Sequence, residues 1–218
     1  MRTSKTLLVT RPSHDPTTRY CYYWSEPVIK KAKEKAFRVL DIADNKATKE
    51  IFESYLQKQE PQFLFLNGHG TQIVVFGHDD KPILDESNVN VVPQGSIMYV
   101  RSCDVGDKLG EDIVQRASAF IGYRKAFGFY RLNNYMRNPL ADSLAKFSFE
   151  PSNLVATTLL KGKTAEEAHE RSREAMRRNL QYLLSSKASE LERQCATPLW
   201  WNYKYQVLHG NKEARLQA

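Results

Sequence analysis

Cysteine and long apolar runs are both scarce in this sequence. The 218 residues include three cysteines, Cys21, Cys103 and Cys195, an odd and widely spaced set that argues against a disulfide framework. The first apolar run, residues 6–10, is too short for the core of a signal peptide or for a membrane span. We therefore expect a cytoplasmic protein with free thiols and no membrane partner.

Internal repeats, low-complexity segments and convincing linkers are also missing. A chain of this length with no shift in composition can bury a sizeable core in one domain. We expect one domain over residues 1–218, with a core sheet in residues 1–125 and a mainly helical part with a closing strand in residues 126–218. Lys and Arg outnumber Asp and Glu by 32 to 25, for a net charge of +7. We interpret this excess as solvated surface charge rather than a nucleic-acid surface.

Short apolar runs bounded by turn residues alternate with segments of helical spacing in the first 125 residues. Such runs are typical of strands buried on both faces of a parallel sheet, and their alternation with helices favours right-handed crossovers. The sequence therefore predicts an α/β fold. The expected strands are residues 6–10, 37–42, 63–66, 96–100 and 119–123, with a small hairpin at 72–84.

The remaining segments are interpreted from their local patterns. Residues 11–24 are polar and rich in aromatic side chains, and we expect them to form a loop at the carboxyl end of the first strand. Thr164 and Glu167 form a capping box that predicts the start of a long amphipathic helix. The aromatic run at residues 199–208 is expected to form the closing strand.

Two of the predicted strands end at reactive residues. The run that begins at Phe63 reaches His69, and the run that begins at Ser96 reaches Cys103. Because ligands bind beyond the carboxyl ends of parallel strands, we expect these two side chains to face one crevice. A cysteine beside a histidine is a nucleophile with its base. A helix expected just after Cys103 would lower the pKa of the thiol if its amino end pointed at the sulfur.

Taken in order, these motifs resemble the caspase-like cysteine peptidases, and most closely their gingipain-like and CHAT-type prokaryotic branch. The motifs are Asn-Gly-His-Gly at 67–70, Ser-Cys at 102–103, Leu-Gly at 109–110 and Ala-Phe-Ile-Gly-Tyr at 119–123. A Gly-Lys-Thr turn at 162–164 and the segment 202–211 extend the resemblance over nearly the whole chain. The resemblance implies a caspase-like three-layer sandwich, with a mostly parallel central sheet flanked by helices.

The resemblance also implies a role for each residue of the site. Cys103 would attack the peptide carbonyl, and His69 would act as general acid and base. The backbone N–H groups of Gly70 and Cys103 would form the oxyanion hole. No third residue that orients the histidine is evident, which fits a clan that works with a dyad.

The substrate pocket implied by the resemblance contains two arginines. Arg101, two residues before the nucleophile, and Arg19 would together bind a carboxylate, which favours an acidic P1 residue. Ser102 and Asp104, which flank Cys103, complete the predicted substrate-binding set.

Other interpretations of the pocket stay open. Arg101 can instead form a salt bridge with Asp104 or Asp107, and Asp15 or Asp85 can form an acidic pocket for Arg or Lys at P1.

The expected function is a regulated cysteine endopeptidase whose partners are a protein or peptide substrate and an activating partner or sensor protein. Two alternatives remain: a catalytically silent module that binds a partner or nucleic acid, and a hydrolase or acyltransferase that acts on a small molecule. No cofactor is expected, although oxygen ligands for Ca²⁺ are present. The residues that offer them are His78, Asp79, Asp80, Asp85 and Glu86.

Overall fold

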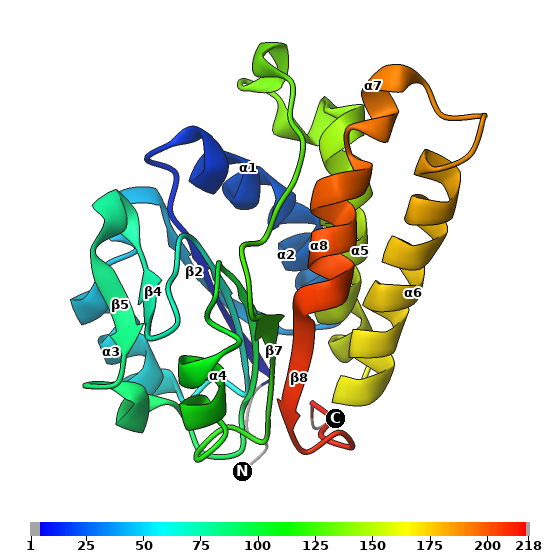
Figure 1. Cartoon of the computed structure of the whole chain (residues 1–218). Coiled ribbons are helices and arrows are strands. Elements are labelled where there is room, and N and C mark those ends of the chain that lie inside the picture. The colour runs from blue at the N-terminus through cyan, green and yellow to red at the C-terminus, as the bar shows by residue number, and fades with distance from the viewer. Residues whose placement is uncertain (1–4, 217–218) are drawn as a thin grey trace.

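A central sheet runs through the computed structural model of the protein, which describes residues 5–216 (Figure 1). Its strand order is β2-β1-β3-β6-β7-β8, and every neighbouring pair is parallel except β7 with β8. The strands are β1 (Thr6–Arg11), β2 (Arg38–Ala43), β3 (Phe63–Asn67), β6 (Ile97–Arg101), β7 (Ala119–Tyr123) and β8 (Gln206–Gly210). The mostly parallel sheet predicted from the sequence is confirmed.

Helices cover both faces of this sheet and make a three-layer structure (Figure 1). One face is covered by α1 (Pro16–Trp24), α2 (Glu26–Glu34), α5 (Ser143–Leu159), α6 (Ala165–Leu183) and α8 (Ala196–Tyr205). The other face is covered by α3 (Lys49–Gln59), α4 (Lys108–Ile113) and the hairpin of β4 (Val74–Phe76) and β5 (Pro82–Asp85). The short α7 spans Glu190–Arg193, and short 3-10 turns lie at Asp44–Lys46, His78–Asp80, Val89–Val91, Asn133–Tyr135 and Pro139–Ala141.

Strands β1, β3, β6 and β7 are buried at every position, and most of their residues are apolar. Leu7 and Val9 of β1 pack with the α1, α2 and α5 layer, whereas Leu8 packs with the α3 and α4 layer. Successive side chains of a strand point to opposite faces, so a strand between two helical layers needs an apolar residue at each position. This is the physical basis of the unbroken apolar runs.

The prediction of a loop over residues 11–24 is wrong for most of this segment, because residues 16–24 form helix α1. Asp15 is the N-cap: its carboxylate accepts from the Thr18 N–H at 2.7 Å, and the Thr18 hydroxyl accepts from the Asp15 N–H at 3.0 Å. Pro16 occupies the first turn, where a missing N–H costs nothing. The aromatic side chains of this segment therefore lie on a helix.

The prediction of a closing strand over residues 199–208 is also wrong in its first part, because residues 199–205 belong to helix α8. The strand that pairs with β7 is β8, which begins at Gln206. The burial follows a helical spacing, since Leu199 and Asn202 are buried whereas Trp200 is 46% exposed. Packing of α8 against α5 and α6 outweighs the strand preference of its aromatic residues.

Two local predictions are confirmed. Thr164 and Glu167 form the capping box of α6, and residues 74–85 contain the antiparallel hairpin of β4 and β5.

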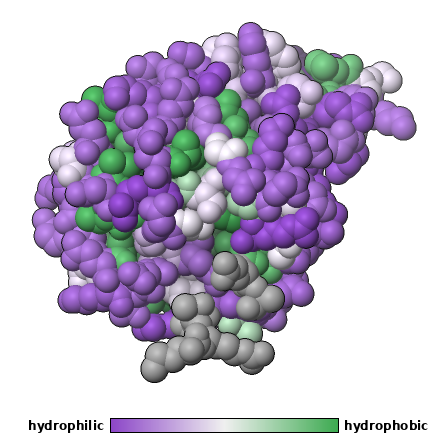
Figure 2. Space-filling model, turned by 90° about the horizontal axis from the view of Figure 1, so that it is seen from below, coloured by the Kyte–Doolittle hydropathy of each residue, from purple (hydrophilic) through white to green (hydrophobic). Residues whose placement is uncertain are grey.

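None of the helices within residues 5–216 combines the length and the hydrophobicity needed to cross a membrane. The end of the molecule seen in Figure 2 is mostly hydrophilic, with only separate apolar areas.

Asp142 ties three segments together and generates a prediction about stability. Its buried carboxylate caps α5 and accepts hydrogen bonds from the Tyr20 hydroxyl at 2.7 Å and from the Leu132 N–H at 2.8 Å. We expect Asp142→Ala to lower the free energy of unfolding by about 3 kcal/mol, because several buried donors lose their acceptor. Ser189→Ala, which removes the exposed N-cap of α7, is the control and should cost about 1 kcal/mol. Equal losses in urea denaturation would contradict this account.

Candidate active site

The segments that follow β3 and β6 lie against each other. These strands are adjacent and parallel, with Asn67 opposite Arg101, so both chains leave the sheet at the same edge. The contact continues beyond the strands, since a Cβ atom at Gly70 would lie 2.8 Å from the carbonyl oxygen of Cys103 and 2.9 Å from the Cβ atom of Ser102. Only glycine fits at position 70, and the backbone of the histidine segment therefore touches that of the cysteine segment.

His69 is held by a carboxylate from the next strand of the sheet. Its Nε2 atom lies 2.5 Å from Oδ2 of Asp15, and its side chain is 33% exposed. Asp15 follows β1, which pairs with β3, so the two residues come from adjacent strand ends. Burial alone would raise the pKa of Asp15, but the hydrogen bonds from Thr18 and His69 outweigh it and hold this pKa below its usual value.

The contact of Asp15 with His69 was not predicted from the sequence. The signal that could have found it is the Asp-Pro pair at residues 15–16, followed by Thr18 at the position of a capping box. Such a pattern fixes a carboxylate at the start of a helix. Because this pattern follows β1, and β1 pairs with β3, the Asp15 carboxylate lies near the end of β3.

The Cys103 thiol is partly buried, and its pKa is raised. Burial raises its pKa, the nearby Asp104 carboxylate raises it further, and a hydrogen bond from the backbone of Phe127 acts in the opposite direction. The helix expected just after Cys103 is α4, which begins only at Lys108 and has six residues, and the pKa of the thiol is raised rather than lowered. Within residues 5–216 no hydrogen bond links the Cys103 sulfur to the His69 ring.

Two backbone N–H groups at the contact of these segments have no acceptor within residues 5–216. Gly70 lies opposite Val75, and the residues on either side of Gly70 make the hydrogen bonds to this strand. The Phe76 N–H donates to the His69 carbonyl, and the Thr71 N–H donates to the Val74 carbonyl. In the part of the chain that the structure describes, neither the Gly70 N–H nor the Cys103 N–H donates to a protein acceptor. These are the two groups named as the oxyanion hole, and both are available to bind a ligand oxygen.

Arg101 is not part of a substrate pocket, which corrects the sequence-based expectation. Its side chain is 1% exposed and its guanidinium is stacked over the rings of Phe65 and Phe149, at 5.1 and 4.9 Å from their centres. It donates to Asn67 Oδ1 and Asn153 Oδ1, at 2.9 Å each, and to two further acceptors in residues 21–25. The alternative of a salt bridge to Asp104 or Asp107 is wrong for the same reason, because neutral oxygens bind the guanidinium.

The other predicted binding residues have different surroundings. Arg19 donates from Nε to the Met136 carbonyl at 2.7 Å and lies over the ring of Tyr23, so it does not join Arg101. Ser102 is buried, and its hydroxyl oxygen has no hydrogen-bond partner among residues 5–216. Asp104 lies next to Cys103 with a positive φ of 59°, a conformation that Asp and Asn tolerate better than most residues.

A segment that the sequence did not connect with the site, residues 124–132, passes over Cys103. Phe127 contacts the thiol through its backbone, and the next residue is clamped by Asn202 of α8. The Asn202 side chain accepts from the Gly128 N–H at 2.8 Å and donates to the Gly128 carbonyl at 2.6 Å. A buried amide on α8 therefore fixes the backbone next to the candidate nucleophile.

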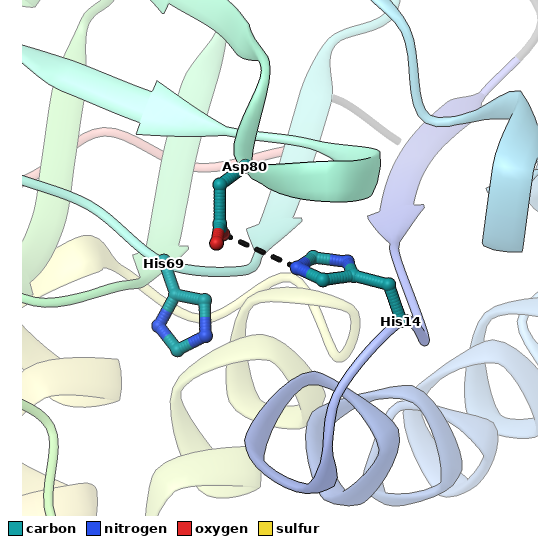
Figure 3. A group of neighbouring side chains, drawn as sticks. All are labelled: His14, His69 and Asp80. Carbon is teal, nitrogen blue, oxygen red and sulfur yellow. Dashed lines mark hydrogen bonds and ion pairs between the residues drawn. The ribbon is translucent and has the colours of Figure 1, made fainter.

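The oxygen ligands considered for Ca²⁺ do not come together. Asp85 accepts from the Ser87 N–H and hydroxyl and lies 3.6 Å from the Lys49 ammonium group, whereas Asp80 lies 3.2 Å from Nε2 of His14. The group within residues 5–216 whose ligand atoms do converge consists of His14, His69 and Asp80 (Figure 3).

The comparisons with known proteins identify the fold. No family model matches the sequence, and no curated protein matches it. The structure is similar to that of the Arg-specific cysteine proteinase gingipain R, with a TM-score of 0.69 and 8% identity over 99% of this chain and 48% of that one. It is also similar to the complex of the Porphyromonas gingivalis RgpB pro- and mature domains, with a TM-score of 0.62 and 8% identity over 98% and 48% of the two chains.

This chain thus spans about half the length of the two solved chains, and it shares their fold. The caspase-like fold expected from the motifs is confirmed.

The environment of Arg101 predicts a structural role for this residue. We expect Arg101→Met to lower the free energy of unfolding by about 2 to 4 kcal/mol, because the acceptors around the guanidinium would stay buried and unpaired. Arg124→Met removes an arginine whose side chain is 47% exposed, and it should change stability by less than about 1 kcal/mol. Chemical denaturation of both variants measures the difference. Equal stability of the two variants would show that Arg101 is not a buried structural group.

The raised pKa of Cys103 predicts how alkylation depends on pH. Because the thiolate is the reactive form, the rate of carbamidomethylation at Cys103 should rise at a higher pH than for a free cysteine. Asp104→Asn removes one cause of the shift and should move the rise to lower pH.

Mass spectrometry distinguishes the three thiols, and buried Cys21 and Cys195, with pKa values of about 11 and about 12, serve as internal controls that should stay unlabelled in the folded protein. If the labelling rate of Cys103 rose at a lower pH than that of free cysteine, the result would instead indicate an activated thiolate.

Proposed function

We propose that this protein is a cysteine endopeptidase in which Cys103 is the nucleophile and His69 the general acid and base. The observation that carries the proposal is the contact of Gly70 with the backbone of Cys103 at the ends of two adjacent parallel strands. The fold, which is that of a known cysteine proteinase, supports the same reaction class.

The hydrogen bond to Asp15 assigns separate roles to the two nitrogens of His69. Nε2 is bound to the carboxylate, so Nδ1 remains to exchange a proton with the thiol and with the leaving group. One ring nitrogen of His69 faces His14 and the other points away from it (Figure 3). A carboxylate on one nitrogen also stabilises the imidazolium that forms when the other takes a proton.

The proposed reaction begins with the neutral thiol. As Cys103 Sγ attacks the carbonyl carbon of the peptide bond, its proton passes to His69 Nδ1, and a tetrahedral intermediate forms. The C–N bond then breaks, and the same proton goes to the leaving amine. A water molecule, activated by His69, attacks the thioester, and the acid product leaves as Cys103 recovers its proton.

The free N–H groups of Gly70 and Cys103 supply the charge stabilisation that this reaction needs. Negative charge develops on the carbonyl oxygen in the tetrahedral intermediate, and donors already in place stabilise it without reorganisation. Loss of one such donor typically reduces kcat by about 100- to 1,000-fold. Burial raises the pKa of the Cys103 thiol, so the proposed reaction needs His69 to accept its proton.

We also propose a basic P1 residue, Arg or Lys, in place of the acidic residue expected from the sequence. The acidic preference depended on Arg101, which is buried and bound to interior oxygens. The charged group beside the nucleophile is instead the carboxylate of Asp104. A carboxylate next to the thiol would attract a cationic side chain, and the similar solved structure is that of an Arg-specific proteinase.

The proposal is tested with fluorogenic peptides that differ only at P1. The purified protein should cleave substrates with Arg or Lys at P1, Cys103→Ala should be inactive, and His69→Ala should lose about 100- to 10,000-fold in kcat. Asp15→Asn should retain KM but lower kcat, because it affects the positioning of His69 rather than substrate binding.

Each possible result distinguishes one part of the proposal. Equal activity of the parent protein and Cys103→Ala would overturn the peptidase assignment. Cleavage that depends on Cys103 but prefers Asp or Glu would retain the dyad and refute the basic preference. Asp15→Asn with unchanged kcat would show that Asp15 only caps α1.

A further inference from the structure

Three of the five histidines of the chain gather beside the candidate active site. The ring of His14 lies between those of His69 and His78, with ring centres 6.2 and 5.5 Å away. His14 follows β1, His69 follows β3, and His78 belongs to the turn of the hairpin. The fold therefore brings imidazoles from three separate segments to one place.

The ligand atoms of His14, His69 and Asp80 converge (Figure 3). One nitrogen of each histidine and one carboxylate oxygen of Asp80 all lie within 4.8 Å of one another. His14 Nε2 is 3.2 Å from Asp80 Oδ1 and 3.8 Å from Asp15 Oδ2. Small side-chain rotations would bring these atoms to the roughly 2 Å bond lengths of a divalent metal ion.

Two features show that this arrangement is built into the fold. Within residues 5–216, the Nδ1 atoms of His14 and His78 are buried without a hydrogen-bond partner, so each ring is held by a carboxylate through Nε2 alone. The turn that bears Asp80 is anchored, because His78 N–H donates to the Ala47 carbonyl at 2.8 Å and Gly77 leaves no room for a side chain against the same carbonyl. Asp80 is thus held in position opposite the histidines.

The chemistry of these ligands selects the class of metal. Two imidazole nitrogens and one carboxylate oxygen are a common ligand set for Zn²⁺, with a water molecule in the fourth position. Ca²⁺ and Mg²⁺ prefer sites made of oxygen alone. The carboxylates of Asp15 and Asp79, close to His69 and His78, add negative charge that offsets the charge of a divalent cation.

We propose that His14, His69 and Asp80 bind a zinc ion, and that the bound ion switches off the candidate active site. The metal site depends only on the geometry of the cluster. Its inhibitory effect rests on the proposed function, in which His69 is the catalytic base.

The mechanism of inhibition follows from the ligand chemistry of imidazole. A neutral histidine that binds a metal through one nitrogen carries its single proton on the other. Bound in this way, His69 cannot accept the proton of the Cys103 thiol. Asp15 Oδ2 lies 2.5 Å from His69 Nε2 and 3.8 Å from His14 Nε2. A metal ion bound between the two rings would therefore compete with Asp15 for His69. The protein therefore cannot cleave peptide while a zinc ion is bound to His69.

The binding part of the proposal is tested on tag-free protein with Zn²⁺ alone, by competition with a chromophoric chelator. We expect one equivalent to bind, with equal affinity for the parent protein and for Cys103→Ala. His14→Asn and Asp80→Asn should each weaken binding by at least about tenfold. His78→Asn changes a neighbouring histidine outside the ligand group and should bind Zn²⁺ as the parent does.

Other results of this titration would overturn the site. Loss of binding in Cys103→Ala, with no effect of His14→Asn or Asp80→Asn, would place the metal between the thiol and His69. The absence of tight binding by the parent protein, or an equal loss in His78→Asn, would also refute the proposed ligands.

The inhibitory part is tested by peptide cleavage at increasing Zn²⁺, reversed by a chelator. His14→Asn and Asp80→Asn should cleave peptide at the parental rate without metal, and they should need at least about tenfold more Zn²⁺ for half inhibition. Inhibition of the variants at the parental Zn²⁺ concentration would contradict the switch. If the parent cleaves no peptide, the proposed function fails, whereas the titration still decides whether the metal site exists.

Discussion

The parallel pairing of β3 with β6 is the contact on which the candidate site depends. It places Asn67 opposite Arg101, and the two chains continue side by side until Gly70 touches the backbone of Cys103. Any residue larger than glycine at position 70 would separate the two segments. Pairing of β1 with β3 adds Asp15 to the same edge. The segments after three adjacent strands thus supply the cysteine, the histidine and the carboxylate of the candidate site, and the fold determines their order.

A buried polar network lies beneath this edge of the sheet. Arg101 at the end of β6 carries a charge into the core, where Asn67 and Asn153 accept its hydrogen bonds and two aromatic rings cover its faces. These contacts join β3, β6 and α5 directly below the candidate site. The segment of Cys103 thus lies between this buried polar network and the Phe127 backbone, whose neighbour Gly128 is bound by Asn202.

The sequence predicted the parts of the fold that depend on local pattern. Strands buried on both faces are mostly apolar, so β1, β3, β6 and β7 were identified close to their observed bounds. The reactive residues that follow two of these strands were identified with them. Contacts between distant residues could not be predicted in this way. The capping role of Asp15 and its bond to His69 join positions far apart in the chain, and the helix α8 depends on packing against α5 and α6. Arg101 was misassigned because its acceptors lie on other elements, as far away as Asn153.

The central claim is that Cys103 and the Gly70 segment form one catalytic unit. It is tested most directly by a crystal structure of the protein with a peptide aldehyde that has Arg at P1. The account predicts a covalent bond from Cys103 Sγ to the aldehyde carbon, with the resulting oxygen about 3 Å from the N–H groups of Gly70 and Cys103. A bond to a different residue, or an oxygen that accepts from neither N–H group, would contradict it.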